Sequence, residues 1–224
     1  MGLLTAEGSR RIARAVEDAE KSTAGEIVVA IIPESDDYAA RELVFAIASG
    51  FIASVIMVIF SEQLIQLFDS LLWIDSALLF PLSMLAGALL AGSSAYALAQ
   101  IPVLDRLIAG RHLMTEAVRR RALRHFTESG VYDTVDRTGV LLLVSVLEHR
   151  VELIADRGIN KMVAANSWEN IVAALVKGIK KGQTADAIEK AVRDIGGILA
   201  EHVPPRADDV NEIADVPTEL EKGS

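Results

Sequence analysis

The chain has 224 residues, of which 51% are apolar and 24% charged, with a formal net charge of −9 and no cysteine. This composition is too apolar for a soluble domain and too charged for a wholly membrane-buried one, so segments of both kinds are expected. The acidic balance argues against nucleic-acid binding, which needs clustered cations, and the lack of cysteine excludes disulfides and thiolate chemistry.

Residues 1–42 are predicted to form the first part of a soluble α/β domain. Thr5 has a side chain that can cap a helix continuing to Ser22, and Gly25 follows the end of that helix. The apolar run EIVVAII, residues 26–32, then predicts a short strand. One such strand is not stable alone, so its partners must come from elsewhere in the chain.

Residues 43–101 are predicted to form a transmembrane hairpin, because the segments 43–60 and 76–101 are apolar and contain no charged residue. About 20 such residues cross the core of a bilayer as a helix. Two buried helices of a large soluble core are the alternative, but the remaining residues are too few to surround such a core. Small residues spaced four apart favour packing of the two spans against each other. Trp73 lies where an interfacial aromatic anchor is expected.

The distribution of basic residues predicts the orientation of the hairpin. None of the 22 lysine and arginine residues falls between Arg41 and Arg106, and the connection between the spans carries no charged residues other than acidic ones. Positive residues collect on the cytoplasmic side of membrane proteins. We therefore expect a multi-pass protein whose two termini and soluble domain are cytoplasmic and whose first partner is the lipid bilayer.

Residues 102–203 are predicted to complete the soluble domain. A helix is expected over residues 111–128, followed by strands over 139–147 and 151–155, which are too close together for anything but an antiparallel hairpin. A strand, a helix and a strand in this order imply that the first two strands are parallel. The expected fold class is therefore α/β, with a small mixed central sheet flanked by helices and the membrane hairpin inserted after the first strand.

Two amphipathic helices and a tail complete the chain. The first helix follows a capping-box pattern from Asn166 to Glu169, and Trp168 lies on its apolar stripe, which predicts a core position. The second helix begins at Thr184 and repeats its apolar residues at helical spacing. Residues 204–224 are acidic and show no periodicity, so they are predicted to be a disordered tail.

Charged residues cluster in the sequence next to the predicted strand ends. With the expected strand directions, Glu26, Asp136, Arg137 and Asp156 all fall at one end of the sheet, and Arg157 follows directly. Carboxylate oxygens suit Ca²⁺ or Mg²⁺, and a guanidinium group binds phosphate. The alternative is that these charges are solvated or paired with one another, as is common at strand ends.

Five stretches of the sequence resemble the TPM domain family: residues 23–29, 37–38, 137–145, 151–159 and 168–171. The resemblance implies an α/β sandwich with a small central sheet. Plant members of the family are associated with acid phosphatase activity and divalent cation binding, whereas other members look like accessory factors for membrane complexes. Similar kin include short bacterial membrane proteins, which implies a bacterial inner (plasma) membrane for this chain.

Two functions are compatible with these features. The first is a membrane-anchored interaction or accessory module, with another membrane protein as its partner. The second is a divalent-metal-assisted phosphatase or related hydrolase. In that case Glu26, Asp136 and Asp156 would hold Ca²⁺ or Mg²⁺, Arg137 or Arg157 would bind phosphate, and a metal-bound water would attack. We favour the first function, because the sequence shows no organised nucleophile and base.

Overall fold

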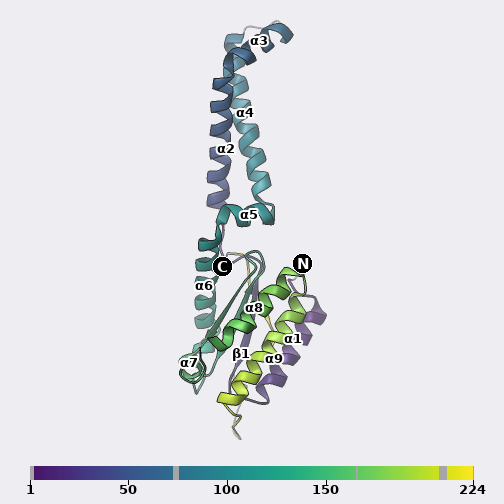
Figure 1. Ribbon diagram of the computed structural model, residues 1–224, viewed down its shortest axis with the longest axis vertical. Coiled ribbons are helices and arrows are strands. Elements are labelled where there is room, and N and C mark those ends of the chain that lie inside the picture. Colours follow the sequence, from purple (N-terminus) through teal and green to yellow (C-terminus); the bar gives the residue numbers. More distant parts are fainter. Residues whose placement is uncertain (1–2, 73–75, 165, 207–210, 224) are drawn as a thin grey trace. The chain divides into compact units, whose positions relative to one another are not determined.

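The computed structural model describes residues 3–72, 76–164, 166–206 and 211–223. The chain divides into two compact units (Figure 1). One is an α/β unit formed by residues Met1–Asp36 and His112–Ser224, and the other is a helical unit formed by residues Asp37–Arg111. The α/β unit is therefore assembled from two distant parts of the sequence, as the strand order predicted.

The α/β unit contains a four-stranded mixed sheet in the order β3-β2-β1-β4. Strands β1 and β2 are parallel and pair from Ile27↔Val140 to Ile32↔Ser145, whereas β2 and β3 are antiparallel. A parallel two-residue pairing adds β4 to the free edge of β1. The strands have these bounds: β1 Ile27–Ile32, β2 Val140–Ser145, β3 Arg150–Ala155 and β4 Thr218–Glu219. The predicted α/β fold class with a mixed sheet is confirmed.

One face of the sheet is covered by α1 (Ala6–Glu20), α8 (Asn166–Lys180) and α9 (Thr184–His202) (Figure 1). Thr5 caps α1 as predicted, since its side-chain oxygen accepts a hydrogen bond of 3.0 Å from the N–H of Gly8. Alternate residues of β1 and β2 join the apolar faces of the three helices in one core cluster, which includes Trp168. This tryptophan is buried, as its place on the apolar stripe predicted.

The opposite face of the sheet is covered by α6 (Arg111–Glu128), which contributes Val118, Ala122 and Phe126 to a second core cluster. A short 3-10 helix, η1 (Val131–Asp133), follows it, and the short helix α7 (Arg157–Met162) follows β3. Helices on both faces bury every residue of β1 and β2. This explains why both strands are continuous apolar runs and show no alternation.

The C-terminal segment packs on the sheet, which differs from the disordered tail predicted from its composition. Beyond β4, the N–H of Leu220 donates to the carbonyl of Ile31 at 2.8 Å, and the N–H of Gly223 donates to that of Glu34 at 3.0 Å. Ile213 and Leu220 are partly buried against the second core cluster. Composition alone predicted disorder because it does not reveal that an open sheet edge can order a polar chain.

The helical unit consists of α2 (Ala39–Ile59), α3 (Ser61–Leu72), α4 (Ser76–Ala99) and α5 (Pro102–Ala109). Two helices, over Ala39–Ile59 and Leu79–Ala99, are long and apolar enough to cross a membrane. The predicted spans, 43–60 and 76–101, fall on these helices, and Trp73 lies outside the described residues. The connection between them is the amphipathic helix α3.

Small residues bring α2 and α4 together. A Cβ atom at Gly50 would lie 2.8 Å from the carbonyl oxygen of Ala88, and one at Gly92 would lie 3.2 Å from that of Ala46. Large apolar side chains point outward instead and are exposed, among them Phe51 (69%) and Leu90 (69%). Small residues between the helices and large apolar residues outside are the arrangement that a lipid environment favours.

Polar contacts join the first turns of α2 to Gln100 and to the end of α5. They explain why α2 begins before the apolar segment that starts at residue 43. Glu42 is buried and accepts a hydrogen bond of 2.5 Å from the side-chain amide of Gln100. The guanidinium group of Arg41 donates to the carbonyl of Ala109 at 2.8 Å, at the end of α5. The helical unit starts at Asp37. The hydropathy of the sequence placed the boundary between the soluble domain and the hairpin after residue 42.

Candidate functional site

Three carboxylates meet where α1 ends and β1 begins. Glu20 accepts a hydrogen bond of 2.8 Å from the N–H of Ile27, and the buried Glu26 accepts one of 3.1 Å from the N–H of Glu212. Asp215, from the C-terminal segment, lines the same cavity of about 320 Å³, together with Arg206. Of the three carboxylates predicted to hold a metal, Glu26 lines this cavity and Asp136 and Asp156 do not, whereas Glu20 and Asp215 line it and were not predicted as site residues.

The pKa of Glu20 is strongly perturbed. Burial raises its pKa to about 8, against the lowering effect of the Ile27 N–H and with further raising effects from Glu26 and Asp215. Glu20 therefore carries its proton at neutral pH. A signal in the sequence could have indicated this: an acidic residue in the last turn of a helix lies against the negative end of the helix dipole.

Asp136 and Arg137 belong to the exposed loop before β2. The carboxylate of Asp136 forms an ion pair with Arg206. Arg137 has a left-handed backbone conformation with φ of 59°, and its guanidinium carbon lies 5.9 Å from the centre of the Tyr132 ring. Its guanidinium group also donates to the carbonyl of Tyr132. Both side chains therefore make contacts with other parts of the α/β unit.

Asp156 and Gly158 form the turn from β3 into α7. The Asp156 side chain caps α7 by accepting a hydrogen bond of 2.5 Å from the N–H of Arg157. A Cβ atom at Gly158 would lie 2.4 Å from the carbonyl oxygen of Arg137 and 2.8 Å from that of Asp136. The backbone of the Asp156–Gly158 turn therefore packs directly against the Asp136–Arg137 loop.

The metal site predicted from Glu26, Asp136 and Asp156 stays a prediction. Within the described ranges, no group of three or more histidine, aspartate or glutamate side chains is placed to hold a metal ion. The second carboxylate oxygen of Asp156 is buried and has no hydrogen-bond partner among the described residues. Arg157 is exposed, so its predicted role in binding phosphate also stays a prediction.

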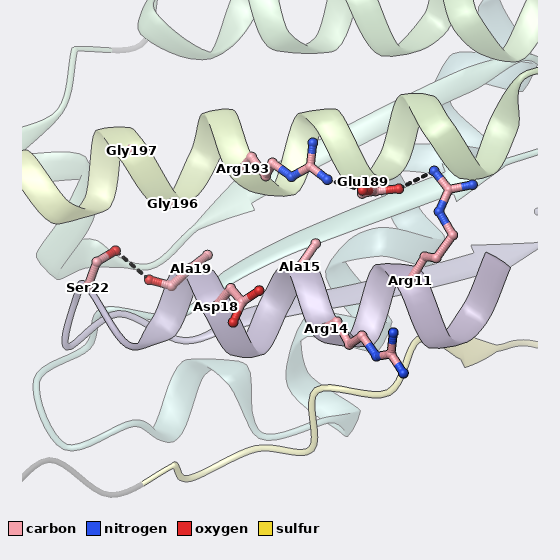
Figure 2. A pocket seen from close by; sticks show the side chains of 10 residues that line it. All are labelled: Arg11, Arg14, Ala15, Asp18, Ala19, Ser22, Glu189, Arg193, Gly196 and Gly197. Carbon is pink, nitrogen blue, oxygen red and sulfur yellow. Dashed lines mark hydrogen bonds and ion pairs between the residues drawn. The ribbon is translucent and has the colours of Figure 1, made fainter. Parts of the chain in front are cut away.

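A second and larger cavity, of about 550 Å³, lies between α1 and α9 (Figure 2). We call it the α1–α9 groove. Small residues from both helices and charged residues that are mostly arginines line it. The lining residues are Arg11, Arg14, Ala15, Asp18, Ala19, Ser22, Glu189, Arg193, Gly196 and Gly197. The first five belong to α1, Ser22 follows the end of that helix, and the last four belong to α9 (Figure 2).

The arginines of the groove differ in their partners. Arg11 and Arg193 both form ion pairs with Glu189, and Arg11 also lies 2.7 Å from Asp186 (Figure 2 shows the Glu189 pairs). Arg14 has no ion pair or hydrogen bond with any side chain in the described part of the chain. Three guanidinium groups and two carboxylates line the groove, so its local charge is positive within an acidic protein.

Two adjacent glycines of α9 differ in whether the packing of the helices requires glycine. A Cβ atom at Gly196 would lie 2.5 Å from the Cβ of Ala19, so the close approach of α1 requires glycine there. At Gly197 a Cβ would meet nothing within 4 Å. Glycine inside a helix costs about 1 kcal/mol relative to alanine, so packing within this unit does not account for Gly197. Gly197 lines the groove and also a second cavity that Asn170 and Ile171 of α8 line.

Comparisons with known proteins agree with this architecture. Residues 107–198 match the family model described as TPM domain. The NMR structure of the BA42 protein from the psychrophilic bacterium Bizionia argentinensis sp. nov. is similar, with a TM-score of 0.58 and 20% sequence identity. The similarity covers 97% of this chain and 96% of that chain and shows a shared fold. A search of the curated proteins found no match.

The first testable prediction concerns Glu20. Its pKa is about 8 in the folded protein, compared with an ordinary value of 4.5, so the unfolded chain loses this proton first as pH rises. The stability that Glu20 contributes is therefore complete below pH 4.5 and is lost as pH rises through about 8. Glu20→Gln removes this loss and should stabilise the protein at pH 9 by about 2 kcal/mol, after discounting for solvent screening.

Unfolding monitored by near-UV circular dichroism in mild detergent at pH 5, 7 and 9 measures this effect. Glu17→Gln is the matched control, because Glu17 lines the same cavity but is exposed and pairs with Lys21 at 2.9 Å. The proposed protonation of Glu20 is wrong if wild type and Glu20→Gln lose stability in parallel from pH 5 to 9.

Proposed function

Because this chain carries a TPM domain, we propose that it is a membrane-anchored protein whose TPM-type α/β unit serves as an interaction or accessory module for a membrane complex. The observation that carries the proposal is the insertion of an apolar helical hairpin inside the α/β unit. The chain leaves that unit after Asp36 and returns to it at His112, so two covalent connections tie it to the hairpin.

The exposed apolar surface of the hairpin supports anchoring in a membrane. Two helices of 21 residues each pass the length and hydropathy requirements of a membrane span, and only 17% and 11% of their most apolar segments are buried. A soluble protein rarely exposes so much contiguous apolar surface, because covering it is what stabilises the folded state. A bilayer would cover this surface.

The charge distribution supports one orientation within a bacterial inner membrane. Arg41 lies in the first turn of α2 and Arg106 follows α4, whereas the described part of the connection, α3, carries acidic residues and no basic ones. Under the positive-inside rule both termini and the α/β unit are cytoplasmic. The lipid bilayer is then one partner, and another membrane protein is the second.

The α1–α9 groove supports an interaction role for the α/β unit. Its lining combines Gly197, where an added side chain would meet nothing within 4 Å, with other small residues and with Arg14. A partner segment could approach the helix backbone closely at Gly197 and place a carboxylate near Arg14. Such close approach with charge pairing at the rim is typical of protein interfaces.

A divalent-metal-assisted phosphatase is the second candidate function. The name of the matched family model refers to a phosphatase, and the buried oxygen of Asp156 has no hydrogen-bond partner among the described residues. In this mechanism Asp156, Glu26 and Asp136 would hold Ca²⁺ or Mg²⁺, which lowers the pKa of a bound water and so makes a nucleophile. Asp136 would have to leave its ion pair with Arg206 to join the metal.

The orientation predicts which positions an impermeant thiol reagent can reach. The chain contains no cysteine, so Ser70→Cys in α3 and Ser9→Cys in α1 each introduce a single label site. In intact cells Ser70→Cys should react and Ser9→Cys should not, whereas both should react after permeabilisation. The reverse pattern would invert the topology, and loss of the protein from the membrane fraction at alkaline pH would refute anchoring.

If a partner binds in the α1–α9 groove, the substitution Gly197→Leu should block its binding. Ser22 is exposed at the groove, so Ser22→Cys offers a site for a photoactivatable crosslinker. In membranes, Gly197→Leu should lower the yield of crosslinked partner about tenfold, because a branched side chain there occupies the open space. Gly197→Ala is the matched control, since it adds one methyl group and should stabilise α9. An unchanged yield with leucine would contradict a role for the groove.

The phosphatase candidate predicts that Asp156→Asn abolishes hydrolysis and leaves the fold intact. Asparagine also caps helices, so α7 should be retained. Wild type should hydrolyse phosphate monoesters with Ca²⁺ or Mg²⁺, and the variant should be slower by about 100-fold or more. The metal should also stabilise wild type by about 2.7 kcal/mol at a hundredfold excess over Kd. Absence of both hydrolysis and metal stabilisation in wild type removes this candidate.

A further inference from the structure

The short helix α5, Pro102–Ala109, turns large apolar side chains outward. Val103 and Leu107, one helical turn apart, are 65% and 77% exposed, whereas Asp105 is buried. We propose that α5 is an interfacial helix, which lies in the plane of the bilayer surface and places Val103 and Leu107 among the lipid acyl chains. The inference rests on the proposed membrane anchoring and adds a second contact between this chain and lipid.

The distribution of side chains on α5 is the reverse of that on a helix at the surface of a soluble protein. Such a helix buries its large apolar residues and exposes its charged ones. In α5 the acidic Asp105 and the small Ala109 are buried, and the helix packs against α2 and α4. Its large residues Val103 and Leu107 are left outside. Apolar surroundings on the outer side of α5 stabilise this arrangement, and water does not.

The break between α4 and α5 follows directly from the sequence. Pro102 is the first residue of α5, and Ile101 before it has an extended backbone with φ of −76° and ψ of 124°. A residue before proline avoids the helical conformation, so α4, which ends at Ala99, cannot continue into α5. The chain therefore starts a separate helix, and α5 runs across the hairpin where α2 begins and α4 ends (Figure 1).

Polar contacts hold α5 at the end of the apolar helices. The guanidinium group of Arg41 donates to the carbonyls of Ile108 (3.2 Å) and Ala109 (2.8 Å). Leu43 and Val44, which follow Arg41 in α2, are 54% and 65% exposed. A helix rises about 1.5 Å per residue, so the exposed apolar surface of α2 begins roughly 3 to 5 Å beyond Arg41. When α2 crosses a bilayer, α5 therefore lies at the interface between acyl chains and headgroups.

The small size of the outer face favours lipid over a protein as its partner. A stable protein interface uses about 20 to 30 residues on each side, whereas this face offers the large side chains of Val103 and Leu107. Arg106, three residues after Val103, is half-buried and donates to the carbonyl of Pro102 at 3.1 Å. A long basic side chain beside an apolar face places its methylene groups along acyl chains and its charge among headgroups.

Fluorescence quenching in phosphatidylcholine vesicles tests the proposal on the purified full-length chain. The chain contains no cysteine, so Leu107→Cys carries a single bimane label on the outer face of α5. Lipids brominated near the headgroup should lower its emission at least about twofold, and lipids brominated near the end of the acyl chain should lower it less. Iodide present on both sides of the vesicles should have little effect, because the label is out of water.

Two further label positions make the result specific. Phe51→Cys, in the middle of α2 and 69% exposed, should be quenched most by lipids brominated near the chain end, since this position lies deep in a candidate span. Val135→Cys lies on the α/β unit and is 75% exposed, so it matches Leu107 in exposure. Its label should be quenched by iodide and by neither lipid. This control excludes that exposure of the label alone brings it into the bilayer.

A charge on the outer face of α5 should lift the helix out of the lipid. With the label at Val103→Cys, the added substitution Leu107→Asp should lower the quenching by headgroup-brominated lipids by about half and increase that by iodide, because a carboxylate is unfavourable among acyl chains. Leu107→Ile is the matched control and should leave both unchanged. Leu107 is exposed, so neither substitution disturbs the packing of the hairpin.

The label at residue 51 separates this inference from the proposed anchoring. If lipid quenches that label and iodide quenches the one at residue 107, the hairpin is in the bilayer but α5 faces water, and the inference alone fails. If neither iodide nor lipid quenches the label at residue 107, another copy of the chain covers the face, and lipid contact is refuted. If brominated lipids leave the label at residue 51 unquenched, the proposed anchoring fails and the inference fails with it.

Discussion

The parallel pairing of β1 with β2 is the constraint on which the rest of this structure depends. Parallel neighbours cannot be joined by a tight turn, so a long connection must leave one end of the sheet and return to the other. Here that connection runs from Pro33 to Gly139 and contains the apolar hairpin as well as α6. The membrane-type segment is therefore part of the topology of the α/β unit and is not an appendage at one terminus.

Burial of β1 on both faces has a second consequence. With helices above and below and β2 alongside, one edge of β1 is left, and the C-terminal segment occupies part of it. The same arrangement brings the end of α1 back to the start of β1, which places Glu20 beside Glu26. The raised pKa of Glu20 and the covering of the β1 edge thus both follow from the burial of β1 on its two faces.

The stretches that resemble the TPM family acquire a structural meaning in this fold. Gly158 allows the turn after β3 to touch the Asp136–Arg137 loop, and Asp156 caps the helix that follows. These contacts explain why the chain has an aspartate and a glycine at those positions, and the explanation requires no catalytic or metal-binding role. By contrast, no contact within the described part of the α/β unit requires glycine at residue 197. Packing thus explains the turn after β3 and does not explain the glycine at residue 197, which lines the α1–α9 groove.

The sequence by itself determined the order and type of most elements, because apolar periodicity and chain breakers such as Thr5 and Gly25 act over a few residues. It also determined the apolar hairpin, since a run without charges is a local property. Only the tertiary structure decided which carboxylates meet, because Glu20 and Asp215 are 195 positions apart and neither belongs to a motif. It likewise decided that residues 218–223 of the acidic C-terminal segment lie along β1, because the open edge of that strand supplies hydrogen-bond partners that composition cannot show.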